Sequence, residues 1–234
     1  MSLTLWQTRY ESWFQINWVH DDKAHDIAHL RRVWMSAQRI MAECEVQPLV
    51  VLTACYFHDV VNLPKNHPER HFASTYAAEE TARILQSDFP DFPVELIPAV
   101  AHAVKAHSFS AAIPPETLEA KIVQDADRLE SLGAIGLARV FYTAGALNRP
   151  LFDSDDPLGK MRELNDIHWT LDHFQKKLLR LPESMQTEEG RRLAEHNADF
   201  LVRYMAKLCA ELQGNLTSLD ESVINDFAPQ RIEY

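Results

Sequence analysis

The chain's most hydrophobic segment ends in two side chains that could do chemistry, His58 and Asp59. Residues 48–57 carry no charge, and the doublet follows them directly. Burying an imidazole and a carboxylate beside apolar side chains is costly unless something compensates them. A divalent metal ion would do so, because neutral imidazole and carboxylate are good ligands for hard or borderline cations. The alternative is a histidine at a helix end followed by an aspartate that caps the next turn.

Two further places in the chain carry residue types that bind metals. His29 lies at the margin of the apolar stripe of an expected helix, where a side chain could reach an interhelical cleft. His25 stands four residues earlier, but no glutamate follows it and the zincin pattern is incomplete, while Asp26 could simply cap the helix. Further along, Asp125 and Asp127 flank an alanine on another expected helix. Periodicity does not choose between these two acids, and a solvated charged face is the alternative for both.

Helices are the elements that must position these residues. Apolar residues recur with a period near 3.6 over 27–41, and Pro48 opens a segment to residue 61 that is apolar on every side. No strand-like alternation extends over a useful length, so the pattern predicts an all-α fold, a multi-helix bundle. The other helices are expected at residues 73–85, 94–106, 114–129, 135–147, 168–180 and 187–213, with a loop at 148–166 and a polar tail at 214–234.

Taken together, these residues resemble the HD-domain superfamily of metal-dependent phosphohydrolases. A histidine on one helix, a His-Asp doublet on the next and an aspartate on a later one follow that superfamily's order, over about residues 20–145. The stretch HLRRV (29–33) is similar to its HxxRV motif, and ADRL (126–129) to its ADRL motif, which selects Asp127 over Asp125. Three stretches are similar to a bacterial subgroup of stand-alone HD hydrolases: PKNHPER (64–70), AHSFS (106–110) and QDADRLESLGAIGLAR (124–139).

The resemblance implies a ligand set and a reaction. One helical domain over residues 1–213 would hold a single divalent ion, with Mn²⁺, Mg²⁺, Fe²⁺, Co²⁺ and Ni²⁺ all acceptable. A tetrahedral structural zinc fits less well, because such sites are usually thiolate-rich and closed. The expected reaction is hydrolysis of a phosphoester or phosphoanhydride of a small molecule, with a nucleotide such as a nucleoside triphosphate as substrate. The implied metal ligands, of which Asp59 is also counted as catalytic, are His29, His58, Asp59 and Asp127.

Positive and polar side chains near these ligands are expected to contact the substrate. In the subgroup resemblance Lys65 and Asn66 would face the phosphates, and Arg70 belongs to the same proline-bearing loop. Arg128 either contacts the substrate or holds a carboxylate ligand in place. HD enzymes that act on guanosine tetraphosphate alarmones carry acidic residues where this chain has Asn-Leu at 62–63, which puts an alarmone substrate in doubt.

Two histidines, His102 and His107, lie on the expected helix between the doublet and Asp127. Some HD proteins carry extra histidines in this interval and bind two metals, but the spacing of five and the missing adjacent-histidine pair favour one metal. We expect His107 to lie near the substrate or donate a proton to the leaving group, and His102 to contact the substrate. Both could instead be ordinary core or surface histidines. The alternative functions are an HD-type di-iron oxygenase and a nucleotide-sensing domain without turnover.

Composition excludes other classes of protein. Lys and Arg number 23 against 34 Asp and Glu, a net charge of -11, which argues against a long nucleic acid as partner. The six glycines begin at Gly133 and fit no dinucleotide or Walker-type motif. The three cysteines, Cys44, Cys55 and Cys209, predict reduced thiols. No secretory core or membrane-length apolar run is present, so we expect a soluble, cytoplasmic protein without membrane partners. The helices at 168–213 could wall the pocket or mediate self-association.

Overall fold

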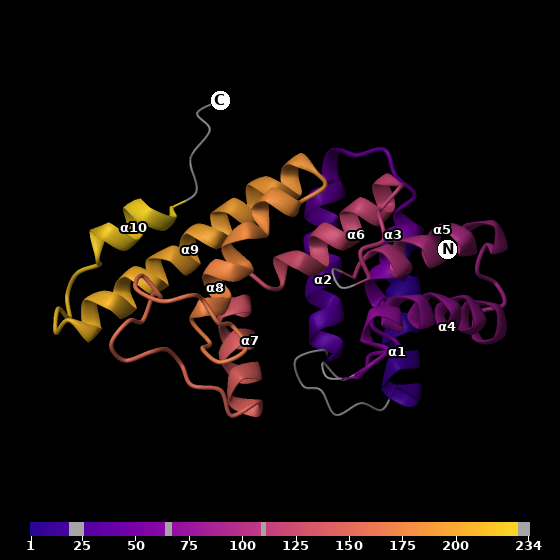
Figure 1. Cartoon of the computed structure of the whole chain (residues 1–234). Coiled ribbons are helices and arrows are strands. Elements are labelled where there is room, and N and C mark those ends of the chain that lie inside the picture. The colour runs from indigo at the N-terminus through magenta and orange to yellow at the C-terminus, as the bar shows by residue number, and fades with distance from the viewer. Residues whose placement is uncertain (19–25, 64–66, 109–110, 229–234) are drawn as a thin grey trace. The chain divides into compact units, whose positions relative to one another are not determined.

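The computed structural model describes residues 1–18, 26–63, 67–108 and 111–228 (Figure 1). Its regular structure over these ranges is helical without strands, which confirms the predicted all-α class. The α-helices are α1 (Leu3–Asn17), α2 (Ile27–Ile40), α3 (Pro48–Phe57), α4 (Ala73–Asp88), α5 (Ile97–Ala106), α6 (Leu118–Leu129), α7 (Gly133–Ala146), α8 (Asp172–Lys176), α9 (Glu188–Leu212) and α10 (Glu221–Phe227). Short 3₁₀ turns are η1 (Met41–Glu43), η2 (Arg70–Phe72), η3 (Val94–Leu96), η4 (Leu178–Arg180) and η5 (Pro182–Ser184).

Two compact units make up the chain, Met1–Asp127 and Arg128–Tyr234, and the division falls within α6. The first unit holds α1 to α5 and most of α6, and the four expected metal ligands all belong to it. The second holds α7 to α10, so the expected polar tail contains a short helix, α10, that packs against α9. Residues 1–213, over which one domain is expected, span both units, each with its own buried side chains, and the single domain stays a prediction.

Helix α1 is absent from the expected elements, yet it supplies much of the core of the first unit. Trp6, Tyr10 and Phe14 recur every four residues along it and are all buried. The rings of Tyr10 and Phe14 pack on Phe57 of α3 with centroids 5.2 and 5.0 Å apart. The Tyr10 hydroxyl lies 2.8 Å from the Thr53 hydroxyl oxygen, also on α3. Because such ring pairs add to the free energy of burial, α1 fixes the helix that leads to the His-Asp doublet.

Helix α3 is the buried helix that the apolar segment predicts, but it is shorter than expected. Pro48 occupies its first turn, where a missing N–H costs no hydrogen bond, and residues 50–57 are all buried. The helix ends at Phe57 rather than near residue 61, because the Val60 N–H turns back to the Phe57 carbonyl at 3.1 Å. Helices α2 and α5 both pack against α3 (Figure 1), and the doublet therefore lies where three helices meet.

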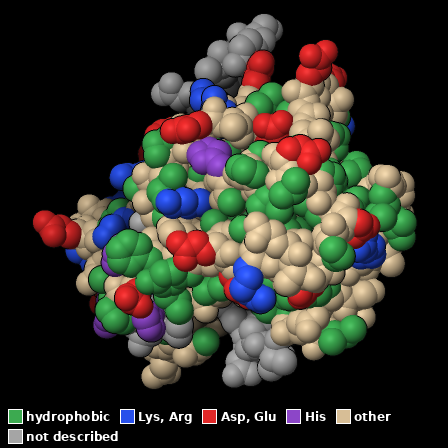
Figure 2. Space-filling view, turned by 90° about the vertical axis from the view of Figure 1, so that its right-hand side faces the viewer, with side chains coloured by type: hydrophobic (Ala, Val, Ile, Leu, Met, Phe, Trp, Pro, Cys, Tyr) green, Lys and Arg blue, Asp and Glu red, His purple; other side chains and the backbone are tan. Residues whose placement is uncertain are grey.

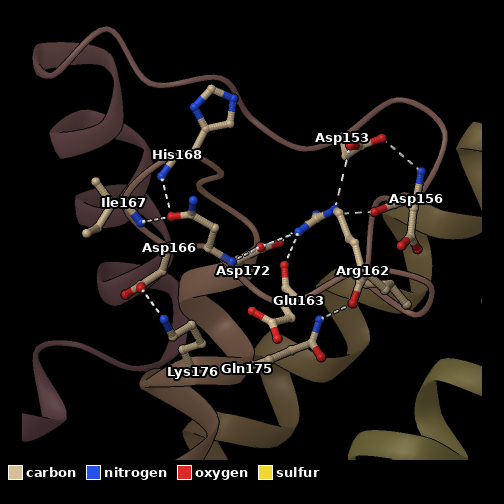
Figure 3. A network of polar contacts seen from close by, with 12 residues as sticks. Asp153, Asp156, Arg162, Glu163, Asp166, Ile167, His168, Asp172, Gln175 and Lys176 are labelled. Carbon is tan, nitrogen blue, oxygen red and sulfur yellow. Dashed lines mark hydrogen bonds and ion pairs between the residues drawn. The ribbon is translucent and has the colours of Figure 1, made fainter.

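The second unit contains a long loop held by one arginine (Figure 3). Asp172, which is fully buried at the start of α8, accepts hydrogen bonds from both terminal nitrogens of Arg162 at 2.6 and 2.9 Å. Its carboxylate also accepts the backbone N–H of Asn165 at 2.6 Å. The loop expected at 148–166 is confirmed, whereas the helix expected at 168–180 is reduced to α8 and η4. The loop folds back on α8 because the buried carboxylate needs these donors.

The surface agrees with an acidic chain. On the face in Figure 2, Lys and Arg side chains are scattered among acidic and hydrophobic ones rather than gathered into one basic area. Across the described ranges, every helix is too short or too polar to cross a membrane.

Candidate metal centre

His29 is placed by the first turn of α2. Asp26 caps this helix, as its position suggested, and its side chain accepts the backbone N–H of His29 at 2.9 Å. The apolar stripe of α2, which includes Leu30 and Val33, faces the core, and His29 is itself 0% exposed. An imidazole buried to this extent needs polar partners, so its surroundings decide what it does. His25 lies outside the described residues.

His58 caps the C-terminal end of α3, with Asp59 directly after it. The Nδ1 atom of His58 lies 2.9 Å from the Cys55 carbonyl oxygen. Because a carbonyl only accepts, Nδ1 carries the hydrogen and Nε2 presents a lone pair. This is the tautomer that a metal ligand requires. The end of a helix also carries partial negative charge, which favours a bound cation beside it.

Asp127 comes from the last turn of α6, and its carboxylate reaches the two histidines. Its Oδ1 atom lies 3.6 Å from Nε2 of His29 and 3.7 Å from Nε2 of His58. Burial opposes the charged form of this carboxyl, yet attraction to the imidazoles of His58, His107 and His29 prevails and lowers the pKa of Asp127. Asp125 is fully buried but is not part of this group. The structure therefore places Asp127, the aspartate that the motif selected, beside His29 and His58.

The donor atoms of the two histidines lie close to both expected carboxylates, although Asp59 and Asp127 fall in different groups of potential ligands. The Nε2 atoms of His29 and His58 are 3.2 Å apart, and Asp59 Oδ2 lies 3.9 and 3.5 Å from them. A metal–ligand bond of about 2.1 Å separates neighbouring ligands of an octahedral ion by about 3 Å. The observed spacings of 3.2 to 3.9 Å are wider than this value by less than about 1 Å, and the set of two imidazoles and two carboxylates suits a divalent cation. His29, His58 and Asp127 form a group that could hold such an ion.

His107 caps the C-terminal end of α5 and faces the same centre. Its Nδ1 atom lies 2.6 Å from the Val104 carbonyl oxygen, and its Nε2 atom lies 3.7 Å from Asp59 Oδ1. Burial and the neighbouring His58 lower the pKa of His107, while Asp59 acts in the opposite direction. The imidazole is therefore biased towards its neutral form, with a lone pair directed at a carboxylate. A proton or a cation could therefore bind between His107 Nε2 and Asp59 Oδ1. Together with His58, these two residues form a second group that could hold an ion.

Two contacts that support the helices of the centre were not predicted from the sequence. Gln124, which is buried on α6, donates from Nε2 to the Ala106 carbonyl oxygen at 2.6 Å and so ties α6 to the end of α5 beside His107. Tyr56, which is 0% exposed on α3, donates to Glu11 of α1 at 2.7 Å. A buried glutamine in a motif-bearing helix is a signal that could have been used. The Tyr56 contact joins distant elements and has no local signal.

The structure describes only some of the residues that are expected to bind substrate. Lys65 and Asn66 lie outside the described residues. Arg70 donates from Nη1 to Asn62 Oδ1 at 2.5 Å and to the Leu63 carbonyl oxygen. Its guanidinium therefore braces the segment that follows the doublet, and substrate contact by Arg70 stays a prediction.

His102 and Arg128 have partners of their own. Nε2 of His102 accepts the backbone N–H of Glu116 at 3.0 Å, which supports the segment before α6, and His102 belongs to neither group of potential ligands. Arg128 lies in the second unit, where its Nη1 donates to the Ser184 carbonyl oxygen at 2.6 Å. Substrate contact by either residue stays a prediction.

Comparisons with known proteins show a similarity to HD-domain proteins. The HD domain family model matches residues 26–132. The Bacillus subtilis protein YpgQ is 29% identical over 213 residues, which cover 87% of this chain and 92% of YpgQ. The crystal structure of YpgQ in complex with ADP gives a TM-score of 0.66 at 26% identity, over 94% of this chain and 100% of the other. An HD-superfamily hydrolase from Bacillus thuringiensis shares the fold, with a TM-score of 0.69 at 24% identity over 91% of this chain and 99% of the other.

Proposed function

We propose that the chain, whose residues 26–132 match the HD domain family model, is a metal-dependent phosphohydrolase of the HD-domain superfamily that hydrolyses a phosphoanhydride or phosphoester of a nucleotide such as a nucleoside triphosphate. The observation that carries this proposal is that the Nε2 atoms of His29 and His58 lie 3.2 Å apart and each lies within 3.9 Å of carboxylate oxygens of both Asp59 and Asp127. The ADP bound to YpgQ supports a nucleotide as the ligand class.

Four side chains of the first unit would hold the divalent ion: His29, His58, Asp59 and Asp127. When bound, that ion would lower the pKa of a coordinated water and offset negative charge on the phosphoryl oxygens. The protein's own task is to present the lone pairs. The bond from Nδ1 of His58 to the Cys55 carbonyl does this by fixing the tautomer and the ring orientation. Burial of both histidines excludes competing water from their nitrogens.

His107 would move a proton. Its Nε2 faces Asp59 Oδ1 at 3.7 Å; a proton taken up on Nε2 from the attacking water would be passed to the leaving-group oxygen, which would return the imidazole to its neutral form. The bond from its Nδ1 to the Val104 carbonyl holds the ring in this orientation throughout. The phosphates would be met by Lys65 and Asn66, which follow in sequence the Asn62 side chain that Arg70 braces.

A second candidate function rests on the second group of potential ligands. His58, Asp59 and His107 could hold another ion, as an HD-type di-iron oxygenase would require. Such an enzyme would contain iron, consume oxygen and release no phosphate from nucleotides. A nucleotide-sensing domain would bind nucleotide and metal but would not hydrolyse the nucleotide.

The test combines metal analysis with a substrate screen. Purified protein is analysed for bound metals and then screened for phosphate and pyrophosphate release from nucleotides with added Mn²⁺ or Mg²⁺. We expect the Asp59→Ala variant to lose both metal and turnover, because it loses a carboxylate ligand. His196→Ala, which changes an exposed histidine of α9, is the matched control and should retain both. Full turnover by Asp59→Ala would reject the proposed reaction.

Lys65→Ala separates substrate binding from metal binding. We expect a raised KM and unchanged metal content, because a lysine that contacts phosphates supplies charge and not a ligand. Loss of metal from this variant would show that the residue has been given the wrong role.

A further inference from the structure

One carboxylate on α1 binds both helices that carry the site histidines. Glu11 Oε1 accepts from Arg31 Nε of α2 at 2.9 Å and from the Tyr56 hydroxyl of α3 at 2.7 Å. Its Oε2 accepts from Nη2 of Arg31 at 2.6 Å, and Gln7 of α1 donates a further hydrogen bond to Oε1 at 3.2 Å. The carboxylate is therefore engaged on both oxygens. These donors lower the pKa of Glu11, which keeps it charged.

Each partner of Glu11 lies two residues from one of the two site histidines in the sequence. Arg31 follows His29 by two residues, and Tyr56 precedes His58 by two residues. In an α-helix two residues correspond to about 200° of rotation, so each partner points away from its histidine. Glu11 thus holds α2 and α3 from behind, while His29 and His58 meet in front with their Nε2 atoms 3.2 Å apart.

Other contacts of α1 lead elsewhere. Arg9 forms a bidentate ion pair with Asp91, both bonds being 2.7 Å long, and Trp13 donates to Asp88 at the end of α4. Tyr10 bonds to Thr53 of α3. These contacts attach α1 to the unit, whereas the Glu11 carboxylate sets α2 and α3 relative to each other.

We propose that Glu11 is a positioning residue for the metal centre: by bridging Arg31 and Tyr56 it fixes the spacing of α2 and α3 and thereby the separation of the His29 and His58 nitrogens. The inference rests on the proposed function for its metal and on the hydrogen bonds for its geometry. It assigns Glu11 no contact with metal or substrate. A carboxylate is suited to the role because a bidentate pair with arginine restricts direction as well as distance.

The experiment measures Mn²⁺ affinity in the full chain, using the electron paramagnetic resonance signal of free Mn²⁺. Glu11→Gln keeps the shape of the side chain but removes the charge that pairs with Arg31. Arg9→Gln is the matched control, because it breaks a bidentate pair on the same helix that reaches neither α2 nor α3. We expect Glu11→Gln to raise the Mn²⁺ Kd by roughly tenfold, and Arg9→Gln to leave it within about twofold of the wild type. Measurements well below the unfolding temperature of each variant separate affinity from stability.

Tyr56→Phe gives a second route, in case Glu11→Gln does not fold. It removes one hydroxyl and should raise the Kd by a smaller factor, with no further increase when combined with Glu11→Gln. Hydrogen exchange of metal-free protein provides a readout independent of the ion. Exchange of the His58 amide, which bonds to the Ala54 carbonyl at 2.9 Å, should accelerate in Glu11→Gln and not in Arg9→Gln.

The outcomes distinguish the two proposals. Wild-type protein that binds no Mn²⁺ would remove the metal from the proposed function, while the exchange measurement would still test the positioning of His58. Wild-type binding with an unchanged Kd and unchanged exchange in Glu11→Gln would overturn the inference and leave the proposed function standing. Equal losses of affinity in Glu11→Gln and Arg9→Gln would also overturn it, because attachment of α1 alone would then explain the effect.

Discussion

Acid should remove the contribution of Glu11 to stability over a definite range of pH. The hydrogen bonds from Arg31 are the largest cause of its lowered pKa, burial acts against them, and the donors on Tyr56 and Gln7 add to the lowering. The result is a pKa of about 2 in the folded protein, against the ordinary value of 4.5 for a glutamate. A carboxyl whose pKa is depressed on folding contributes stability above its unfolded pKa and loses it as the pH falls through the folded pKa. The contribution should therefore be complete above about pH 5 and vanish towards about pH 2.

The size of this contribution follows from the difference between the two pKa values. At about 1.4 kcal/mol for each pKa unit, a shift from 4.5 to about 2 corresponds to roughly 3 kcal/mol. The Glu11 side chain is 19% exposed and that of Arg31 46%, so solvent screens the pair. We therefore expect a smaller value, about 1 to 2 kcal/mol at pH 7.

Urea unfolding of wild type and Glu11→Gln at several pH values between 7 and 3 measures this directly. Other titrating groups largely cancel in the difference between the two proteins, which should shrink as the pH falls below about 4.5. Metal-free protein is used, so that metal binding does not contribute. A difference that stays constant across the range, or that is absent at pH 7, would refute the reasoning.

Three other variants test separate parts of the structure. A Cβ added at Gly136 would lie 2.2 Å from the backbone carbonyl carbon of Ser131, whereas a Cβ added at Gly145 would meet nothing within 4 Å. Thermal unfolding should therefore show that Gly136→Ala is destabilised and that Gly145→Ala is stabilised by up to about 1 kcal/mol. Thr53→Val leaves the buried Tyr10 hydroxyl without its 2.8 Å partner and should cost about 1 to 3 kcal/mol in urea unfolding, less if Tyr10 is also changed to Phe. His107→Gln should keep bound metal by elemental analysis but lower kcat by a factor of about 10² or more; unchanged kcat would exclude the proton-transfer role.

The sequence predicted the residues of the site more completely than it predicted the helices and contacts that support them. Helical periodicity predicted the helix that carries His29, a continuous apolar run after Pro48 predicted the helix that ends at His58, and the family motif chose Asp127, whose donor atom lies beside both histidines. That these residues bind a metal stays a proposal. Periodicity also predicted the all-α class, because each buried helix repeats its apolar residues locally.

What could not be predicted depends on contacts between distant elements. The aromatic spacing of α1 is a helical signal, but its meaning lies in rings of α3 that follow some forty residues later, such as Phe57. The end of α3 at Phe57 is set by a turn hydrogen bond that an apolar run does not reveal. Arg70 looks like a charge for substrate, yet the structure shows it bracing Asn62, because a guanidinium satisfies whichever carbonyls the chain folding brings near.

The two histidines at helix ends carry a consequence for reading divergent sequences. Each Nδ1–H occupies a carbonyl in the last turn of its helix, at Cys55 and at Val104, so each imidazole also closes a helix. Selection for folding alone would then tend to retain His58 and His107 in a descendant that had lost its chemistry. The carboxylates of Asp59 and Asp127 instead face the histidine nitrogens at 3.5 to 3.9 Å. In related chains, replacement of these acids is therefore the more telling sign that catalysis has been abandoned.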